Sequence, residues 1–252
     1  MRQQHLARFG LALVALGLFL ALWQGVVRIG DYPPFILPSP GAVARRLLDL
    51  LSDGSLWLHA WATLQEVLGG LALGTATAVL VGYALAHSPL AERLLAPYIV
   101  ASQAVPVVAI APLLVIWFGT GLLSKVLICA LIVFFPILIN TVVGIRSVGR
   151  DLWDLMRILE AGRWQMIRLL EIPAALPVLL GGLKVGATLS VIGAVVGEFV
   201  ASDRGLGYLL KQGQQLYDTP LVFVGIATLV VMAQTLYGGV ILVERVVANR
   251  DV

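Results

Sequence analysis

The hydrophobic residues of this chain form long continuous runs and do not alternate with polar residues. One helical crossing of a bilayer takes about 20 apolar residues. Six stretches approach that length, at about 9–28, 63–86, 94–117, 122–144, 175–198 and 221–244. Lipid offers no partner to backbone N–H and C=O groups, so each run is expected to be helical, and runs this continuous are not barrel strands. The pattern predicts an all-α polytopic membrane protein with six transmembrane helices.

The composition agrees with a membrane location. Of 252 residues, 60% are hydrophobic and 12% are charged, whereas globular domains average about 45–50% apolar and about 25% charged residues. The net charge of +3 is positive, as in many proteins that bind nucleic acid. However, no group of Lys and Arg with interleaved aromatic residues forms a stripe, so the sequence predicts no nucleic-acid partner. The expected surroundings are the lipid bilayer.

The basic residues predict the orientation of the spans. With both termini in the cytoplasm, the cytoplasmic segments carry Arg2, Arg8, Arg93, Arg146, Arg150, Arg157, Arg163, Arg168, Arg245 and Arg250. The opposite side then carries Arg28, Arg45, Arg46, Arg204 and Lys211. Cytoplasmic loops are enriched in Lys and Arg, so this division favours cytoplasmic termini.

The first 62 residues form a distinct unit. Basic residues before the first run also fit a signal peptide, but that run is about long enough to cross, and no small-x-small site follows it before Arg28. We expect a retained span, then the stiff proline-rich connector "DYPPFILPSP" on the extracytoplasmic side, then a short amphipathic helix opened by Ser39 or Pro40. Residues 63–252 are expected to form a five-helix core with a cytoplasmic loop at about 145–174.

That loop holds a charged, half-apolar insert, "MRILEAGRWQMIRLLEIPAALP" at 156–177. A helix over about 163–171 places apolar side chains on one arc and polar ones on another. The apolar arc holds Met166, Ile167, Leu169 and Leu170; the polar arc holds Gln165, Arg168 and Glu171. Pro173 is expected to stop or bend the helix. The insert has no nucleophile beside a base and no metal-ligand cluster, so we predict docking to a partner, with no catalytic residue and no metal site.

The predicted fifth span carries the candidates for a translocation pathway. Lys184, Thr188 and Glu198 share one helical face. Charges inside a membrane are costly and tend to face protein or water, which makes these residues pathway candidates. The alternatives are an interfacial position for Glu198, and for Lys184 a side chain that reaches the cytoplasmic surface or bonds a neighbouring carbonyl.

Glycine and proline residues add detail to the spans. Glycine is dense in the second and fifth spans, where it allows close approach of helix backbones. These residues are Gly69, Gly70, Gly74 and Gly82, and Gly181, Gly182, Gly186, Gly193 and Gly197. Pro106, Pro112 and Pro136 are expected to kink the third and fourth spans.

At the insert, the sequence resembles the "EAA" loop of ABC importer permeases. Asp154 takes the first acidic place of that motif, Leu155 and Met156 replace its two alanines, and Ile172–Pro173 closes it. The motif's glycine is missing: its position is Glu160, unless a register shift makes Gly162 its substitute. The resemblance implies that the loop docks in a groove on an ATPase subunit through Asp154, Glu160, Ala161, Gly162, Arg163, Trp164, Ile172 and Pro173.

The resemblance extends along the chain to the nitrate/sulfonate/taurine-type branch of these permeases. It rests on "ILPSPGAV", "QAVPVVAIAPLLVIWFGTG", "IPAALPVLLGGLKVGA" and "GEFVASDRGLGYLL" in this order, and the last is closer to vitamin-type members. It implies a type I importer fold in a bacterial inner membrane, a homodimer, two ATP-binding subunits and an extracytoplasmic solute-binding protein. The chain has no G-x-x-x-x-G-K-[ST] motif, so ATP and Mg²⁺ are expected on the partner and no cofactor on this chain.

The implied function is import of a small organic solute driven by ATP hydrolysis on a partner. The expected solute is a vitamin or precursor such as riboflavin or a thiamine pyrimidine precursor, or otherwise a sulfonate, taurine or nitrate. The main alternative is a secondary transporter or channel, which would need deep carboxylates or broken helices and usually an internal repeat. A membrane enzyme comes third, because it would need a clustered His/Asp/Glu set.

Overall fold

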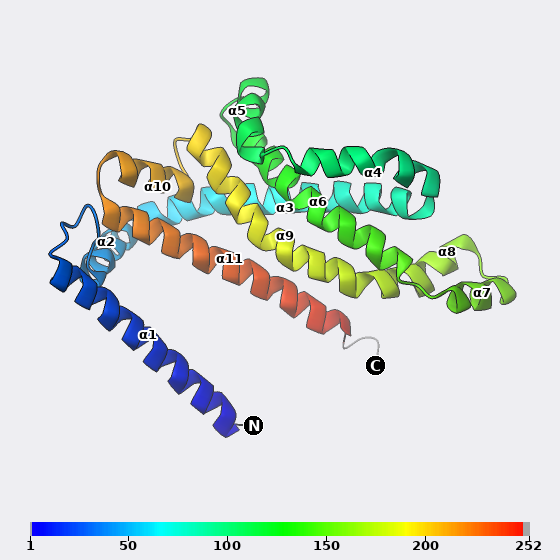
Figure 1. Ribbon diagram of the computed structural model, residues 1–252, viewed down its shortest axis with the longest axis horizontal. Helices are drawn as coiled ribbons and strands as arrows, with labels where there is room; N and C mark the ends of the chain where they lie inside the picture. Colours follow the sequence, from blue (N-terminus) through cyan, green and yellow to red (C-terminus); the bar gives the residue numbers. More distant parts are fainter. Residues whose placement is uncertain (1, 249–252) are drawn as a thin grey trace.

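A computed structural model describes residues 2–248, and within that range every regular element is a helix (Figure 1). The helices are α1 (Arg2–Gly30), α2 (Pro40–Ser52), α3 (Ser55–His87), α4 (Pro89–Gln103), α5 (Val107–Phe118), α6 (Leu122–Arg146), α7 (Arg150–Ile158), α8 (Arg163–Met166), the π-helical turn η1 (Ile167–Glu171), α9 (Ile172–Val200), α10 (Leu206–Gln215) and α11 (Thr219–Ala248). The all-α prediction is confirmed. Arg250, part of the charge argument, lies outside the described residues.

The core is a layer in which α6 lies between α3 and α9 (Figure 1). Glycine makes this close packing possible on both sides of α6. A Cβ atom at Gly74 of α3 would lie 2.7 Å from the Ala130 carbonyl oxygen, and one at Gly193 of α9 would lie 2.8 Å from Cys129 Cα. Real Cβ atoms do not approach so closely, so the backbones could not pack this way with larger residues. The predicted role of the glycines is confirmed at these positions, although Gly181 faces open space.

Among the described residues, four helices are long and apolar enough to cross a membrane: Ser55–His87, Leu122–Arg146, Arg163–Val200 and Thr219–Val246. The predicted third span at 94–117 is broken. It consists of α4 and α5, which meet at an angle of 94°. Pro106 precedes α5 and has no N–H to continue the α4 hydrogen-bond pattern, so the expected kink there is confirmed as a break. The apolar part of α1, Val14–Gly30, is shorter than the other spans.

Prolines inside the other helices disturb them less. The helix α6 continues through Pro136, whose carbonyl accepts a hydrogen bond from Asn140 Nδ2 at 2.7 Å. Pro173 was expected to stop or bend its helix, and it does not stop it, because a helical segment runs without a break from Arg163 to Val200. Pro173 lies in the first turn of α9, directly after η1. A π-helical turn shifts the hydrogen-bond pattern by one residue, which accommodates the missing N–H of a proline.

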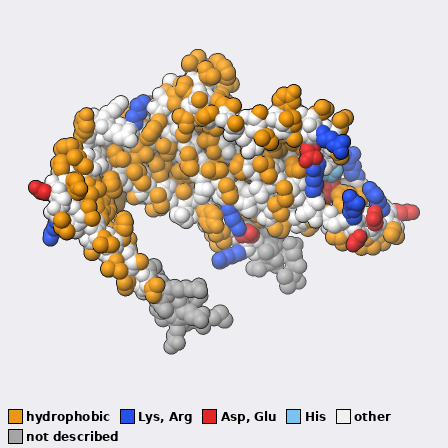
Figure 2. Space-filling model, in the orientation of Figure 1, with side chains coloured by type: hydrophobic (Ala, Val, Ile, Leu, Met, Phe, Trp, Pro, Cys, Tyr) orange, Lys and Arg blue, Asp and Glu red, His pale blue; other side chains and the backbone are white. Residues whose placement is uncertain are grey.

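The molecule has two chemically different ends (Figures 1 and 2). One end carries α2 and α10, and the other carries α7 and α8.

The amphipathic helix α2 is confirmed: the Ser39 hydroxyl caps it by accepting the Ala42 N–H at 3.2 Å, and Leu50 is buried. The helix α10 was not predicted. Residue 63, taken as the start of the core, lies within α3, which begins at Ser55 after Gly54 with φ +77°.

Candidate functional site

The segment from α7 to η1, residues 150–171, is the candidate coupling loop. Its first helix, α7, ends in a Schellman motif, in which two backbone bonds close the last turn. The Glu160 N–H donates to the Arg157 carbonyl and the Ala161 N–H to the Met156 carbonyl, both at 3.0 Å. Glu160 has φ +53°, the left-handed conformation that glycine usually supplies at this position of the motif. The structure therefore places Glu160 at the turn where the EAA pattern has its glycine.

Gly162 does not take over this role. Its φ of −67° is open to any residue, and it precedes the first residue of α8. Its N–H donates to Gln165 Oε1 at 2.8 Å, a bond that closes the start of the helix. The alternative register, with Gly162 in place of the motif's glycine, is not supported by this geometry.

The loop presents exposed apolar side chains at the α7 end of the molecule. Ile158 is 78% exposed, Leu159 66% and Trp164 71%. Acidic and basic side chains gather at the same end of the molecule (Figure 2). Among them, the Asp154 carboxylate lies 3.6 Å from Arg157 Nη1. Ala161 is half-buried, whereas Arg163, Ile172 and Pro173 are exposed. A mixed apolar and charged protrusion is a surface that can dock in a groove on another protein.

The predicted arcs of the 163–171 helix are only partly correct. Leu170 is buried as expected, but Leu169 is 63% exposed and Glu171, assigned to the polar arc, is buried. The π-helical turn rotates the residues after Met166 relative to a regular helix, which moves Glu171 inward. Its Oε1 lies 3.1 Å from His87 Nε2 at the end of α3, so Glu171 connects the loop to that helix.

The three candidate pathway residues of α9 have different surroundings. Lys184 Nζ lies 2.6 Å from Glu244 Oε2 of α11, and neither side chain is fully buried (21% and 35% exposed). The Thr188 hydroxyl donates to the Val185 carbonyl at 2.8 Å within its own helix. Glu198, by contrast, is fully buried. The structure therefore does not bring Lys184 and Glu198 to one site, and it gives Lys184 an ion-pair partner that the sequence pattern did not indicate.

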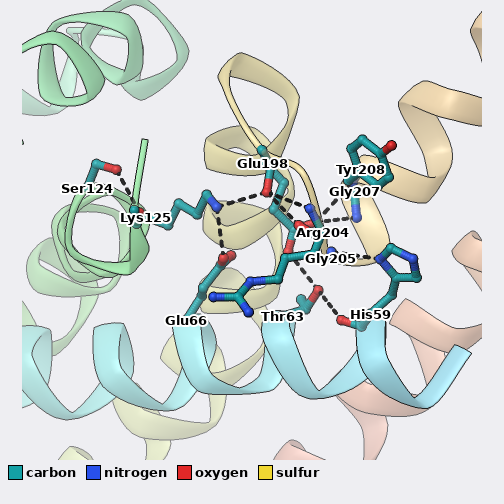
Figure 3. A network of polar contacts seen from close by, with 12 residues as sticks. His59, Thr63, Glu66, Ser124, Lys125, Glu198, Arg204, Gly205, Gly207 and Tyr208 are labelled. Carbon is teal, nitrogen blue, oxygen red and sulfur yellow. Dashed lines mark hydrogen bonds and ion pairs between the residues drawn. The ribbon is translucent and has the colours of Figure 1, made fainter. Parts of the chain in front are cut away.

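The buried carboxylate of Glu198 holds the start of α10 (Figure 3). It accepts hydrogen bonds from the Thr63 hydroxyl at 2.6 Å, from the Tyr208 N–H at 3.1 Å and from the Gly207 N–H. The first N–H groups of a helix have no partner within the helix, and the N-terminus carries partial positive charge. A carboxylate at this position accepts hydrogen bonds from these N–H groups and also neutralises the partial positive charge. Glu198 therefore fixes α10 to α9.

Two side chains of α3 complete the attachment of α10. The Gly205 N–H donates to His59 Nδ1 at 3.0 Å, and the Leu206 N–H donates to the Thr63 hydroxyl oxygen at 2.7 Å. Gly205 has φ +118°, and a Cβ atom there would lie 2.2 Å from Glu198 Cδ. Only glycine meets both conditions, which explains the spacing of glycine and glutamate in "GEFVASDRGLGYLL".

An ion pair adjoins these contacts. Lys125 of α6 extends towards α3 and α9 (Figure 3). Its Nζ lies 3.4 Å from Glu66 Oε1 and donates to Ser202 Oγ at 2.8 Å. Lys125 and Glu66 are each only 3% exposed. We call His59, Thr63, Glu66, Lys125 and Glu198 the polar cluster.

Sequence reasoning missed most of this cluster. His59 and Lys125 are both buried, and neither was among the residues that the sequence singled out. His59, Thr63 and Glu66 are spaced by four and three residues, so they share one face of α3 with Gly70. That spacing was readable in the sequence, but their partners come from loops and helices more than 50 residues away along the chain.

A family model described as "Binding-protein-dependent transport system inner membrane component" matches residues 74–248. The chain is 53% identical over 236 residues to the riboflavin transport system permease protein RibX of Chloroflexus aurantiacus, covering 94% of this chain and 88% of that protein. It is 37% identical over 207 residues to the formylaminopyrimidine transport permease protein ThiX of Halalkalibacterium halodurans, covering 82% of each. It is 31% identical over 240 residues to the taurine transport system permease protein TauC of Escherichia coli, covering 93% of this chain and 87% of that protein.

Proposed function

The chain belongs to the family of binding-protein-dependent inner-membrane transport components, and from this premise we propose that it imports riboflavin or a closely related vitamin. It is the membrane-embedded permease subunit of an ABC importer for small solutes, and an ATP-binding subunit and a solute-binding protein are its partners. The observation that carries the choice of solute is the 53% identity to the riboflavin permease over 94% of the chain. The pyrimidine and taurine permeases are less similar, at 37% and 31%.

The proposed topology has six crossings and cytoplasmic termini. The four long helices count as one crossing each, α4 with α5 as the broken fifth, and α1 as the sixth. Both α1 and α11 run with their terminal ends away from α2 and α10 (Figure 1). The basic residues of α7, α8 and η1 lie at the opposite end from α2, which supports a cytoplasmic position for the loop.

In this proposal, ATP hydrolysis on the ATP-binding subunit supplies the energy for transport, because the sequence of this chain carries no phosphate-binding loop. Two copies of the chain form the pathway, and each inserts Ile158, Leu159 and Trp164 into a groove on one ATP-binding subunit. When the ATP-binding subunits close, they move the loop. The continuous segment from Arg163 to Val200 transmits that movement along α9, and the contact between Glu171 and His87 transmits it to α3.

The three candidate pathway residues divide into two proposed roles. Lys184 and Thr188 face the pathway, where the ion pair with Glu244 is partly open to solvent. Glu198 holds α10 in position and does not touch the solute, because its oxygens are occupied by Thr63, Gly207 and Tyr208.

Uptake into proteoliposomes tests this function. The permease is reconstituted with its ATP-binding subunit and supplied with binding protein and labelled riboflavin. We expect accumulation only when ATP is enclosed with the ATP-binding subunit, and no accumulation of labelled taurine. Accumulation at the same rate without the ATP-binding subunit would contradict an ABC mechanism and favour a secondary transporter. ATP-driven uptake of taurine and not riboflavin would contradict the choice of solute alone.

A further inference from the structure

A cavity of about 450 Å³ lies beside the polar cluster, at the end of the molecule that carries α10. Its walls come from α3, from the turn between α5 and α6, from the start of α6, and from the loop between α9 and α10. The polar lining consists of Gln65, Glu66, Thr120, Lys125, Ser202, Asp203 and Arg204. Pockets for small molecules range over about 300–1,000 Å³, so the cavity is large enough for a small organic ligand.

One buried group in this cavity has an unused hydrogen-bonding atom. Glu66 Oε1 lies near Lys125, but Glu66 Oε2 is buried without any hydrogen-bond partner among the described residues. Leaving a buried carboxylate oxygen unpaired costs about 1–3 kcal/mol or more. The neighbouring Glu198 shows the contrast, because hydrogen-bond donors of the protein occupy both of its oxygens. The cavity therefore presents an acceptor to a donor that this chain does not supply.

The charges around the cavity decide what kind of donor fits. Lys125 already provides a cation 3.4 Å from Glu66, and its ammonium group is also bonded to Ser202. Asp203 and Arg204 also line the cavity with opposite charges, so the four charged lining residues sum to zero, and the buried Glu198 adds a negative charge nearby. The lining therefore has no excess of positive charge to attract a sulfonate or nitrate anion, and the Lys125 ammonium group already occupies the position that a bound cation would take beside Glu66. A neutral molecule rich in O–H and N–H groups is the remaining match.

We propose that this cavity is an entry subsite for a neutral, hydrogen-bond-donating solute, which Glu66 Oε2 binds as acceptor while Gln65 and Arg204 bind its carbonyl or hydroxyl oxygens. The inference rests on the proposed function and narrows its solute class to neutral donor-rich molecules. The α10 end is the one we place outside the cell, so the subsite meets the solute first after the binding protein releases it. The unused oxygen makes the site selective, because an anion without an N–H or O–H group, such as nitrate, cannot donate a hydrogen bond to it.

Equilibrium dialysis of labelled riboflavin against the complete importer in nanodiscs, without nucleotide, tests the subsite. We expect Glu66→Gln to weaken binding at least 10-fold, because the amide leaves a single acceptor oxygen to serve both Lys125 and the solute. We expect Gln65→Ala to weaken it about three-fold, because it removes one hydrogen-bonding group. Gln65 is exposed, so its truncation leaves the fold intact even if Glu66→Gln disturbs assembly. Asp49→Asn is the matched control: it lies on the exposed face of α2 at the same end and outside the cavity, and binding should be unchanged.

The outcomes separate this inference from the proposed solute. Unchanged riboflavin binding in both cavity variants overturns the subsite, even if ATP-driven riboflavin uptake is normal. Displacement of riboflavin by excess taurine, or a requirement for Na⁺ or NH₄⁺, overturns the neutral-solute assignment. If the importer carries a neutral pyrimidine and not riboflavin, the proposed solute is wrong, and weakened pyrimidine binding in the same variants supports the subsite.

Discussion

The two ends of this permease differ in which side chains they bury and which they expose. At the α10 end, the side chains of His59, Thr63 and Glu198 are buried and occupied by the first N–H groups of α10. At the α7 end, Ile158 and Trp164 are exposed. The backbone there also contains a π-helical turn, which follows the left-handed residue Glu160. Buried and satisfied contacts make a rigid attachment, whereas exposed apolar groups on irregular backbone suit a segment that another protein holds and moves.

The largest expected effect is on the rigid end, from Glu198→Ala. This change leaves the N–H groups of Gly207 and Tyr208 buried without an acceptor, at about 1–3 kcal/mol each. We expect a loss of about 3 kcal/mol in the free energy of unfolding, measured by thermal unfolding in detergent. Glu198→Gln keeps one acceptor oxygen and should lose less. Equal stability of the alanine variant and the unmodified protein would show that α10 is not held by this carboxylate.

Gly205→Ala should have the next largest effect. Its φ of +118° is strained for alanine, and the new Cβ atom would collide with the Glu198 carboxyl group. A residue held in such a conformation costs about 1–3 kcal/mol, and we expect a loss of stability of about 2 kcal/mol. Gly121→Ala is the control, because it lies at the same end with φ −75° and open space around its Cα. If both variants unfold at the same temperature, the close contact between Gly205 and Glu198 is not important for stability.

At the opposite end, Glu160→Gly should stabilise the loop. Glu160 pays the penalty of a left-handed conformation, about 1–2 kcal/mol, that glycine avoids. We expect slower hydrogen exchange at the amides that close the turn, Glu160 and Ala161, and unchanged or improved co-purification of the ATP-binding subunit. Gly162→Ala, at φ −67°, should leave the exchange rates nearly unchanged. Faster exchange in the Glu160→Gly variant would contradict the assigned turn.

The smallest effect on stability is expected between the two ends, at the ion pair of Lys184 and Glu244. Both side chains are partly exposed, so the pair should contribute less than about 1 kcal/mol to folding. Lys184→Met and Glu244→Gln, alone and together, should therefore lower solute uptake several-fold with little change in unfolding temperature. Normal uptake in all three variants would remove Lys184 from the pathway.

The sequence predicted the helical class, the amphipathic helix α2 and the glycine-mediated packing well, because each depends on residues close together in the chain. It left the place of the motif's glycine open between Glu160 and Gly162, and the left-handed backbone angle of Glu160 favours the first. It predicted a kink at Pro106 but not the 94° bend between α4 and α5, and it did not predict the π-helical turn that moves Glu171 inward to His87. The polar cluster was missed because its members lie far apart along the chain: Thr63 and Glu198 are 135 residues apart.

Site-directed crosslinking tests the central claim, that the loop of residues 150–171 is held by the ATP-binding subunit. Cys129 is the chain's single cysteine and is buried, so Trp164→Cys creates the accessible thiol for a thiol-linked photocrosslinker. Asp53→Cys places an exposed thiol at the other end. We predict that Trp164→Cys crosslinks to the ATP-binding subunit in the assembled importer, with a yield that changes when ATP is added, and that Asp53→Cys does not. An absence of crosslinks at Trp164→Cys, with crosslinks at Asp53→Cys, would contradict the account.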